Sequence, residues 1–222
     1  MAQEQSNAEL PDAASAVERV IHAVREGVHN GSFAPGQRLI EGDFTAALQV
    51  SRGPVREAFR RLSAEGVLVE EPYRGMSVRR ISAEELRGIY RVREMLEGLA
   101  ARLAAERVAA GASAADLKRI AAKLNQAIRK KAMQDYIDLN KDLHDAIVEI
   151  AQSSTVATLL AQLNFHVIRV RYRNLLNWDN AKSSNQGHAE IVAAIATGDG
   201  DAAEEAMRRH IRDSGTRIFA DV

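Results

Sequence analysis

Residues 51–62 place apolar and polar positions with the period of an α-helix, about 3.6 residues per turn. The apolar positions fall on one side and are Val55, Ala58, Phe59 and Leu62. Another side carries three arginines spaced by four, Arg52, Arg56 and Arg60. Ser51 suits the position before the first turn, and Pro54 is tolerated inside that turn. The pattern predicts a helix with one packing face and one basic face.

The segments on both sides of this helix decide how its arginines are interpreted. On their own, arginines at this spacing are typical of an ordinary solvated helix face. Upstream, however, residues 44–48 predict a short helix, and Gln49 and Val50 predict a tight turn. Downstream, residues 67–69 and 76–79 read as two strands around a turn at 71–75. A helix-turn-helix followed by a hairpin predicts a winged helix.

After residue 81 the pattern becomes helical. Ser82 and Glu85 have the spacing of a capping box, which predicts a helix start and a domain boundary. The helices predicted from there are 83–110, 113–130, 133–152, 155–176, 184–196 and 201–217. Alanine-rich helices with short connections predict an antiparallel bundle. The predicted fold is mainly α, with a disordered tail at 1–14, a winged helix-turn-helix at 15–81 and an all-helical domain at 82–222.

The composition fits this organisation and excludes other classes of protein. A chain of 222 residues with 46% hydrophobic content can form two domains with real cores. The 30 basic residues balance 30 acidic ones, which argues against a general nucleic-acid coat protein. No window approaches the ~18 apolar residues of a membrane span, and the N-terminus lacks the features of a signal peptide. The absence of cysteine excludes disulfides and thiolate metal sites, so a cytoplasmic protein without a membrane partner is expected.

The winged-helix segment resembles the GntR family of bacterial transcription regulators. The matching positions before the predicted turn are Gly31, Pro35, Gly36, Leu39 and Glu41. The matching positions after it are Val50, Ser51, Arg52, Pro54, Val55, Arg56, Glu57, Ala58, Leu62, Glu65, Gly66, Arg74 and Gly75. So many spaced matches are far more specific than a short motif. The chain departs from the family at Phe44 and Thr45, where Leu-Ala is usual, and at Gln49, where a turn glycine is common.

The resemblance implies which residues contact double-stranded operator DNA. They are Ser51, Arg52, Gly53, Pro54 and Arg56 of the recognition segment, and Arg74 and Gly75 of the wing tip. An arginine can donate two hydrogen bonds to guanine in the major groove, and an arginine beside a glycine can enter the minor groove. Arg38 fits a phosphate contact or a base reader. A salt bridge from Arg38 to Glu41 or Asp43 fits about as well.

Four polar residues of the bundle are candidates for holding a metal. Asn140 and His144 are four residues apart, so they share one helix face at the border of an apolar stripe. His188 opens a later predicted helix, and His210 lies on the last one. A lone bundle histidine is more often a hydrogen-bonded core or surface residue than a ligand.

The bundle resembles the FadR-type effector domain, and these four residues match the ligands of its metal-binding branch. That resemblance implies a bound divalent ion, zinc first and nickel or manganese as alternatives. The usual oxygen ligand is an aspartate, whereas this chain has the neutral and weaker donor Asn140. The match therefore predicts a metal site with an altered affinity or metal preference.

The same resemblance implies a small organic acid as the effector in the bundle. Arg93 is a candidate to bind its carboxylate, because a guanidinium pairs bidentately with that group. An ion pair between Arg93 and Glu97, four residues further on, is an equally good explanation. Arg169 and Tyr172 belong to a second polar cluster and are further candidates for effector binding.

These features together predict a ligand-responsive transcription regulator, a repressor, that binds a two-fold symmetric operator as a homodimer. Two subunits are needed because one recognition helix reads only a few base pairs. A metal-dependent hydrolase is the competing class, but no motif places a general base and a DNA reader would have no role, so an enzyme is not expected. An architectural DNA-binding protein without an effector would not need buried histidines.

Overall fold

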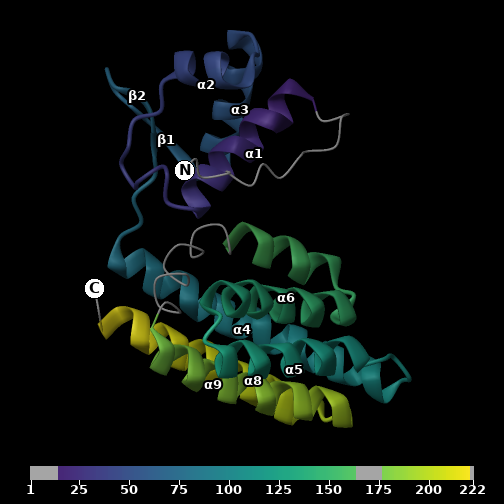
Figure 1. The fold of residues 1–222 in the computed structure, drawn as a ribbon. Coiled ribbons are helices and arrows are strands. Elements are labelled where there is room, and N and C mark those ends of the chain that lie inside the picture. The colour runs from purple at the N-terminus through teal and green to yellow at the C-terminus, as the bar shows by residue number, and fades with distance from the viewer. Residues whose placement is uncertain (1–14, 164–176, 221–222) are drawn as a thin grey trace. The chain divides into compact units, whose positions relative to one another are not determined.

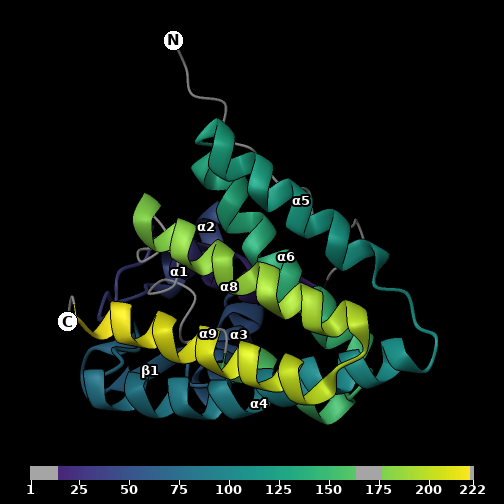
Figure 2. The same cartoon turned by 90° about the horizontal axis from the view of Figure 1, so that it is seen from below.

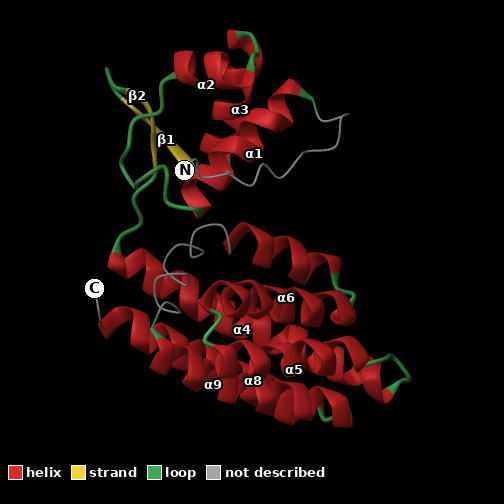
Figure 3. Ribbon diagram, viewed as in Figure 1, coloured by secondary structure: helices red, strands yellow, loops and turns green. Residues whose placement is uncertain are grey.

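A computed structural model describes residues 15–163 and 177–220 of the chain. The chain divides into two compact units, with the boundary between Arg80 and Ile81 (Figure 1). The first unit combines helices with a two-stranded sheet, and the second is built of helices (Figure 3). The predicted fold class, a winged helix-turn-helix followed by an all-helical domain, is confirmed.

The first unit contains the predicted helix-turn-helix and wing. Its elements are α1 (Ala16–His29), α2 (Glu41–Leu48), α3 (Arg52–Ala64), β1 (Leu68–Glu71) and β2 (Gly75–Val78). Helices α2 and α3 form the helix-turn-helix. The two strands pair antiparallel, with Leu68 opposite Val78 and Glu71 opposite Gly75, and form the wing.

The turn between α2 and α3 is made without glycine. Gln49 takes a left-handed backbone conformation, with φ at 52°, at a cost that glycine would avoid. Ser51 occupies the N-cap of α3, but its side chain makes no capping hydrogen bond. The expected cap is therefore wrong in this detail. A capping serine bonds the amide of the second or third helical residue, and the third residue here is Pro54, which has no N–H.

An aromatic cluster packs against the apolar face of α3. That face is buried as predicted, through Val55, Ala58, Phe59 and Leu62. The ring of Phe59 meets the ring of Phe44 edge-on, with centroids 5.3 Å apart, and Phe33 lies 5.7 Å from Phe44. Such pairs contribute about 0.5–1.5 kcal/mol each beyond the burial of their area. The departure from the family at Phe44 is thus accommodated by aromatic packing.

The second unit is an antiparallel helical bundle. Its helices are α4 (Ala83–Ala109), α5 (Ala115–Lys130), α6 (Met133–Ala151), a helical segment at 154–163, α8 (Trp178–Thr197) and α9 (Gly200–Ala220). Ser82 caps α4 as predicted, accepting a hydrogen bond from the amide of Glu85 at 3.1 Å. Helix α9 runs alongside α4 in both views (Figures 1 and 2). Arg102 pairs with Glu204 at 3.0 Å and Glu94 with Arg212 at 2.7 Å, so the two helices are antiparallel.

Helix α8 begins six residues before the predicted start at 184. The side chain of Asn177 caps it, accepting hydrogen bonds from the amides of Asp179 and Asn180. The first turns of α8 are almost entirely polar, so they lack the apolar period that marks a helix in sequence. As a consequence, His188 lies in the middle of a helix rather than at its beginning.

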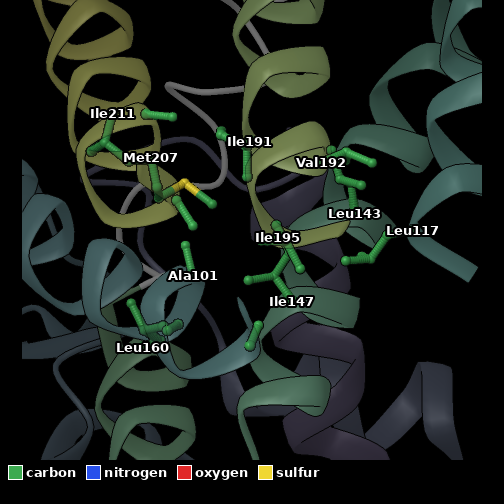
Figure 4. Packing of buried hydrophobic residues seen from close by; sticks show 14 of the residues in the cluster. Ala101, Leu117, Leu143, Ile147, Leu160, Ile191, Val192, Ile195, Met207 and Ile211 are labelled. Carbon is green, nitrogen blue, oxygen red and sulfur yellow. The ribbon is translucent and has the colours of Figure 1, made fainter. Parts of the chain in front are cut away.

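The core of the bundle is formed by apolar side chains from α4, α5, α6, α8 and α9 and from residues 154–163 (Figure 4). Ile147, Ile191 and Ile195 are at most 1% exposed. Full burial of such a side chain stabilises the fold by roughly 1.5–3 kcal/mol. Among the helices of 15–163 and 177–220, none is long and apolar enough to cross a membrane. Set into this apolar interior are the buried polar side chains that form the candidate site.

Candidate functional site

The recognition helix α3 presents the predicted DNA-contacting residues to solvent. Arg52, Gly53 and Arg56 are exposed, and nothing lies within 4 Å of the place where a Cβ would stand on Gly53. The Nε of Arg56 donates to Glu41 of α2 at 3.0 Å, with the arginine side chain 59% exposed. Exposed pairs contribute little to stability, so this contact orients Arg56 without withdrawing it from a DNA partner.

Arg38 lies beside the wing rather than in an ion pair. Its backbone forms an isolated antiparallel bridge with Ser77 of β2, and its side chain is exposed. No ion pair joins Arg38 to Glu41 or Asp43 among the described residues, and Glu41 pairs instead with Arg56. This placement leaves Arg38 available for a DNA contact.

The wing tip carries an aromatic residue that the sequence analysis did not single out. Tyr73 is fully exposed and has a left-handed backbone, with φ at 64°. Arg74 follows with 77% of its side chain exposed, and Gly75 has φ at 76°. The left-handed conformation at Gly75 explains why glycine suits that position. Because Tyr73 lies in the turn predicted at 71–75, its exposure at the tip of the hairpin could have been predicted from the sequence.

Three helices bring three histidines together inside the bundle. His144 of α6, His188 of α8 and His210 of α9 are each at most 6% exposed. Each offers one ring nitrogen, and these three nitrogens lie within 4.8 Å of one another. The ring centroids of His188 and His210 are 4.6 Å apart, and each lies about 5.5 Å from that of His144. The predicted cluster is therefore assembled from residues up to 66 positions apart in the sequence.

Glu97 of α4 joins this cluster to Arg93. One carboxylate oxygen, Oε2, lies 2.5 Å from Nδ1 of His144, and the other, Oε1, accepts from Nη2 of Arg93 at 2.5 Å. The ion pair foreseen as one explanation of Arg93 thus exists. Burial acts to lower the pKa of Arg93, but attraction to the carboxylate of Glu97, with a smaller contribution from Tyr90, raises it overall. The guanidinium is consequently fixed in its charged form.

Arg93 also keeps capacity for a second partner. Its side chain is 1% exposed, and its Nε and Nη1 atoms have no hydrogen-bond acceptor among the described residues. Its guanidinium carbon lies 4.9 Å from the centre of the Tyr90 ring. Buried donors without acceptors are costly, and the chemistry of these two donors suits an acceptor such as a carboxylate.

Gly187 is a further residue of the site that sequence reasoning missed. A Cβ placed on Gly187 would lie 2.8 Å from Nδ1 of His210. A side chain there would force the imidazole of His210 to shift. A glycine inside a helix, directly before His188, was the available signal, because glycine disfavours a helix interior.

The fourth predicted metal residue, Asn140, lies one helical turn before His144 on α6 and is 4% exposed. Its placement on the same face agrees with the expected stacking of the two side chains. The predicted effector residues Arg169 and Tyr172 lie outside the described residues.

The chemistry of the cluster suits a divalent metal ion. Neutral imidazole is a common ligand of zinc and nickel, and three histidines leave positions open for water or a ligand carboxylate. Burial excludes competing solvent. A carboxylate on the second nitrogen of a ligand histidine is the usual outer-shell arrangement, and Glu97 occupies that position at His144. The residues present therefore fit such an ion.

An exposed basic helix in one unit and a buried polar cluster in the other are features expected of a ligand-responsive DNA-binding regulator. Comparison with known families agrees: residues 16–78 match the model for bacterial regulatory proteins of the gntR family, and residues 88–213 match the FCD domain. The chain belongs to the GntR family and carries a C-terminal FCD domain.

Relatives along nearly the whole chain are transcription regulators by name. The HTH-type transcriptional repressor RspR of Escherichia coli K12 is 29% identical over 199 residues, which cover 88% of this chain and 86% of RspR. The Nta operon transcriptional regulator of Aminobacter aminovorans is 28% identical over 187 residues, 84% of this chain and 87% of the relative. The structure of E. coli McbR/YncC shares the fold, with a TM-score of 0.79 at 23% identity over 94% of this chain and 99% of that one. The protein is a transcription regulator rather than an enzyme, with operator DNA as the partner of the winged helix and an effector as the ligand of the FCD domain.

Proposed function

We propose that the protein is a homodimeric repressor whose operator binding is controlled by a small organic acid in a metal-containing FCD domain. The observation that carries the proposal is the buried group of His144, His188 and His210 linked through Glu97 to Arg93. Apolar residues of similar volume would stabilise a bundle at least as well as this group. Its presence in the core therefore supports a role in binding. The repressor named RspR supports the sign of regulation.

The metal in this proposal is zinc, with nickel or manganese as alternatives, held by the three histidines and Asn140. A bound divalent ion supplies a Lewis acid that attracts a carboxylate oxygen. The neutral amide of Asn140 is a weaker oxygen donor than the usual aspartate, so more of the affinity falls on the histidines. Arg93 contributes the remaining donors, Nε and Nη1, to the acid.

The proposed dimer uses the exposed apolar side of α4. Val92, Met95 and Leu99 are 49%, 54% and 38% exposed, and with Gly88 they follow a spacing of four, three and four. Apolar residues at this spacing are typical of a helix face that packs against another helix. A second copy of α4 would cover these side chains and hold two recognition helices at a fixed separation. The two helices would then read two half-sites.

The DNA contacts are proposed at the start of α3, at the wing tip and at Arg38. They are Arg38, Ser51, Arg52, Gly53, Pro54, Arg56, Arg74 and Gly75. The acid changes operator affinity only if it binds two states of the protein with different affinity. We expect this difference to arise from the angle that the FCD domain imposes on the two recognition helices.

Native mass spectrometry of the protein purified without chelator tests this proposal in one experiment. We expect a dimer that carries one divalent ion per chain, with an additional organic-acid mass where the acid co-purifies. A monomer would contradict the dimer. Protein that takes up no zinc, nickel or manganese on titration would contradict the metal site and leave Arg93 as the anchor for an acid.

A further inference from the structure

We infer that Glu97 is the positioning residue of the proposed metal site: it orients His144 with one carboxylate oxygen while Arg93 holds the other. This inference rests on the proposed function, since it concerns the same domain and the same ion. From the sequence alone, Glu97 was considered only as an ion-pair partner of Arg93. In the structure, Glu97 lies between the histidine cluster and Arg93, the candidate for binding the effector.

The contacts of Glu97 decide which nitrogen of His144 faces a metal. A carboxylate paired with a guanidinium has only acceptor oxygens, and Oε2 lies 2.5 Å from Nδ1 of His144. Nδ1 must therefore carry the hydrogen, which leaves the lone pair on Nε2 for the ion. The side chains of Glu97 and His144 are 5% and 6% exposed, so solvent does not compete for this contact.

Glu97 acts on the metal through His144 rather than as a ligand. The nitrogens that can share one ion are those of His144, His188 and His210, and Glu97 is not a member of this group among the described residues. Outer-shell carboxylates of this kind fix the orientation of the ring and raise its basicity. Their removal lowers metal affinity about 10- to 100-fold.

Arg93 fixes Glu97 in turn. The two residues are one helical turn apart on α4, and Nη2 of Arg93 donates to Oε1 at 2.5 Å. A planar guanidinium holds a carboxylate in one orientation, which a lysine ammonium does less well. Metal affinity then depends on Arg93, which acts on His144 through Glu97. By reciprocity, an acid that engages Arg93 also changes the affinity for the metal.

Zinc titration of the full chain, by competition with a chromophoric chelator, tests the role of Glu97. We expect Glu97→Gln to bind zinc about 10- to 100-fold more weakly than the wild type. Glu97→Asp, which keeps the charge but is too short to reach both partners, should also bind more weakly. Glu94→Gln is the matched control, because Glu94 lies on the same helix and pairs with Arg208 and Arg212. Thermal unfolding followed by circular dichroism establishes that each variant is folded.

Arg93→Lys tests whether Arg93 influences zinc binding through Glu97 or independently of Glu97. We expect it to weaken zinc binding in the wild-type background and to have no further effect in Glu97→Gln protein. Non-additivity of this kind is the signature of residues that act through one another. Additive effects of the two substitutions would overturn the link through Glu97.

A spectroscopic measurement shows whether Glu97 orients His144 or only stabilises the fold. In the long-range ¹H–¹⁵N correlation spectrum of the zinc-loaded protein, we expect His144 to be protonated at Nδ1 and metal-bound at Nε2. Zinc on Nδ1, or equal zinc affinity of Glu97→Gln and wild type, would overturn the inference while leaving the metal site intact. Wild-type protein that binds no zinc would instead contradict the proposed metal site itself.

Discussion

The same side chain, arginine, serves in opposite environments in the two units. In the DNA-binding unit, Arg56 and Arg74 have 59% and 77% of their side chains exposed and make only solvent-screened contacts. In the helical unit, Arg93 is 1% exposed and makes a short contact with a buried carboxylate. The exposed arginines are accessible to a large polyanion such as DNA, whose phosphates are negatively charged. The buried arginine is oriented before any ligand arrives.

This difference predicts how the two units respond to substitution. Surface changes usually leave stability within about 0.5 kcal/mol, so losses at α3 or the wing should appear in DNA affinity alone. A buried hydrogen-bonded cluster couples binding to packing, since each member touches the next. Changes in the FCD domain should therefore alter metal binding and, in part, stability.

The largest effect is expected from breaking the exposed apolar side of α4. Met95→Glu places a charge in the proposed dimer interface, so the dimer should dissociate and operator affinity should fall by about 100-fold or more as the two half-sites lose their linkage. Analytical ultracentrifugation and fluorescence anisotropy on operator DNA measure the two quantities. Lys123→Glu, at an exposed position of α5, is the control for added negative charge. A dimeric Met95→Glu protein would rule out this interface.

Next in size is the loss of a metal ligand. His188→Ala should weaken zinc binding by more than about 100-fold, a larger effect than removal of an outer-shell partner. Isothermal titration with zinc measures it, and His22→Ala in α1 serves as the matched histidine control. Unchanged zinc affinity would show that the cluster is a packed group of side chains and not a metal site.

Substitution of Arg56 tests whether the exposed arginines of the first unit bind DNA. Arg56→Ala should lower operator affinity roughly 5- to 150-fold, the loss of one base-contacting arginine, without changing zinc affinity. The operator is obtained by selection from random DNA, and anisotropy gives the affinity. Arg119→Ala on α5, which removes an exposed pair with Asp116, should leave DNA binding unaltered. Equal losses in both variants would point to general charge rather than a specific contact.

A smaller effect is expected where packing alone positions a histidine. Gly187→Ala should displace His210, because its Cβ would stand 2.8 Å from Nδ1, and zinc affinity should fall about 10-fold. Gly42→Ala on α2 adds the same methyl group where the nearest atom, of Ile40, is 3.9 Å away, and this variant should bind zinc normally. If the two variants bind zinc alike, the close approach of α8 and α9 is not needed for the site.

The smallest effect is expected from the loss of a buried hydrogen bond in the helical unit whose strength depends on pH. The hydroxyl of Tyr136 donates to the carbonyl of Ala181 at 2.8 Å, and burial raises its pKa to about 12. Since the unfolded tyrosine ionises near pH 10, the contribution is complete below that pH and is lost as pH rises toward 12. Tyr136→Phe should lower the free energy of unfolding by about 1 kcal/mol at neutral pH. It should also flatten the high-pH decline, and urea unfolding at pH 7 and pH 11 checks both points.

Local signals made the DNA-binding unit predictable. The period of α3, the wing and the left-handed turn at Gln49 each depend on residues close together in the sequence. Helix α1 was not predicted, although Ser15 and Glu18 have the spacing of its cap, and Ser15 does accept from the amide of Glu18 at 3.2 Å. The cap expected from Ser51 failed because Pro54 removes a donor amide.

The candidate site in the bundle was only partly accessible from sequence. The three histidines were found by resemblance, and Arg93 was left with two equal explanations. The contact of Glu97 with His144 and the close approach of Gly187 to His210 were not predicted, because they arise between helices, α4 with α6 and α8 with α9. Such contacts have no signature in the spacing of a single helix.

The most direct test of the account is the operator affinity of the zinc-loaded protein with and without a millimolar pool of small mono-, di- and tricarboxylic acids. We expect the pool to change the dissociation constant of the operator complex at least about fivefold, because allosteric coupling changes affinity by about 5- to 150-fold. His188→Ala protein should show no such change. An operator affinity that is the same with and without the acids would contradict control of DNA binding by a carboxylate in the FCD domain.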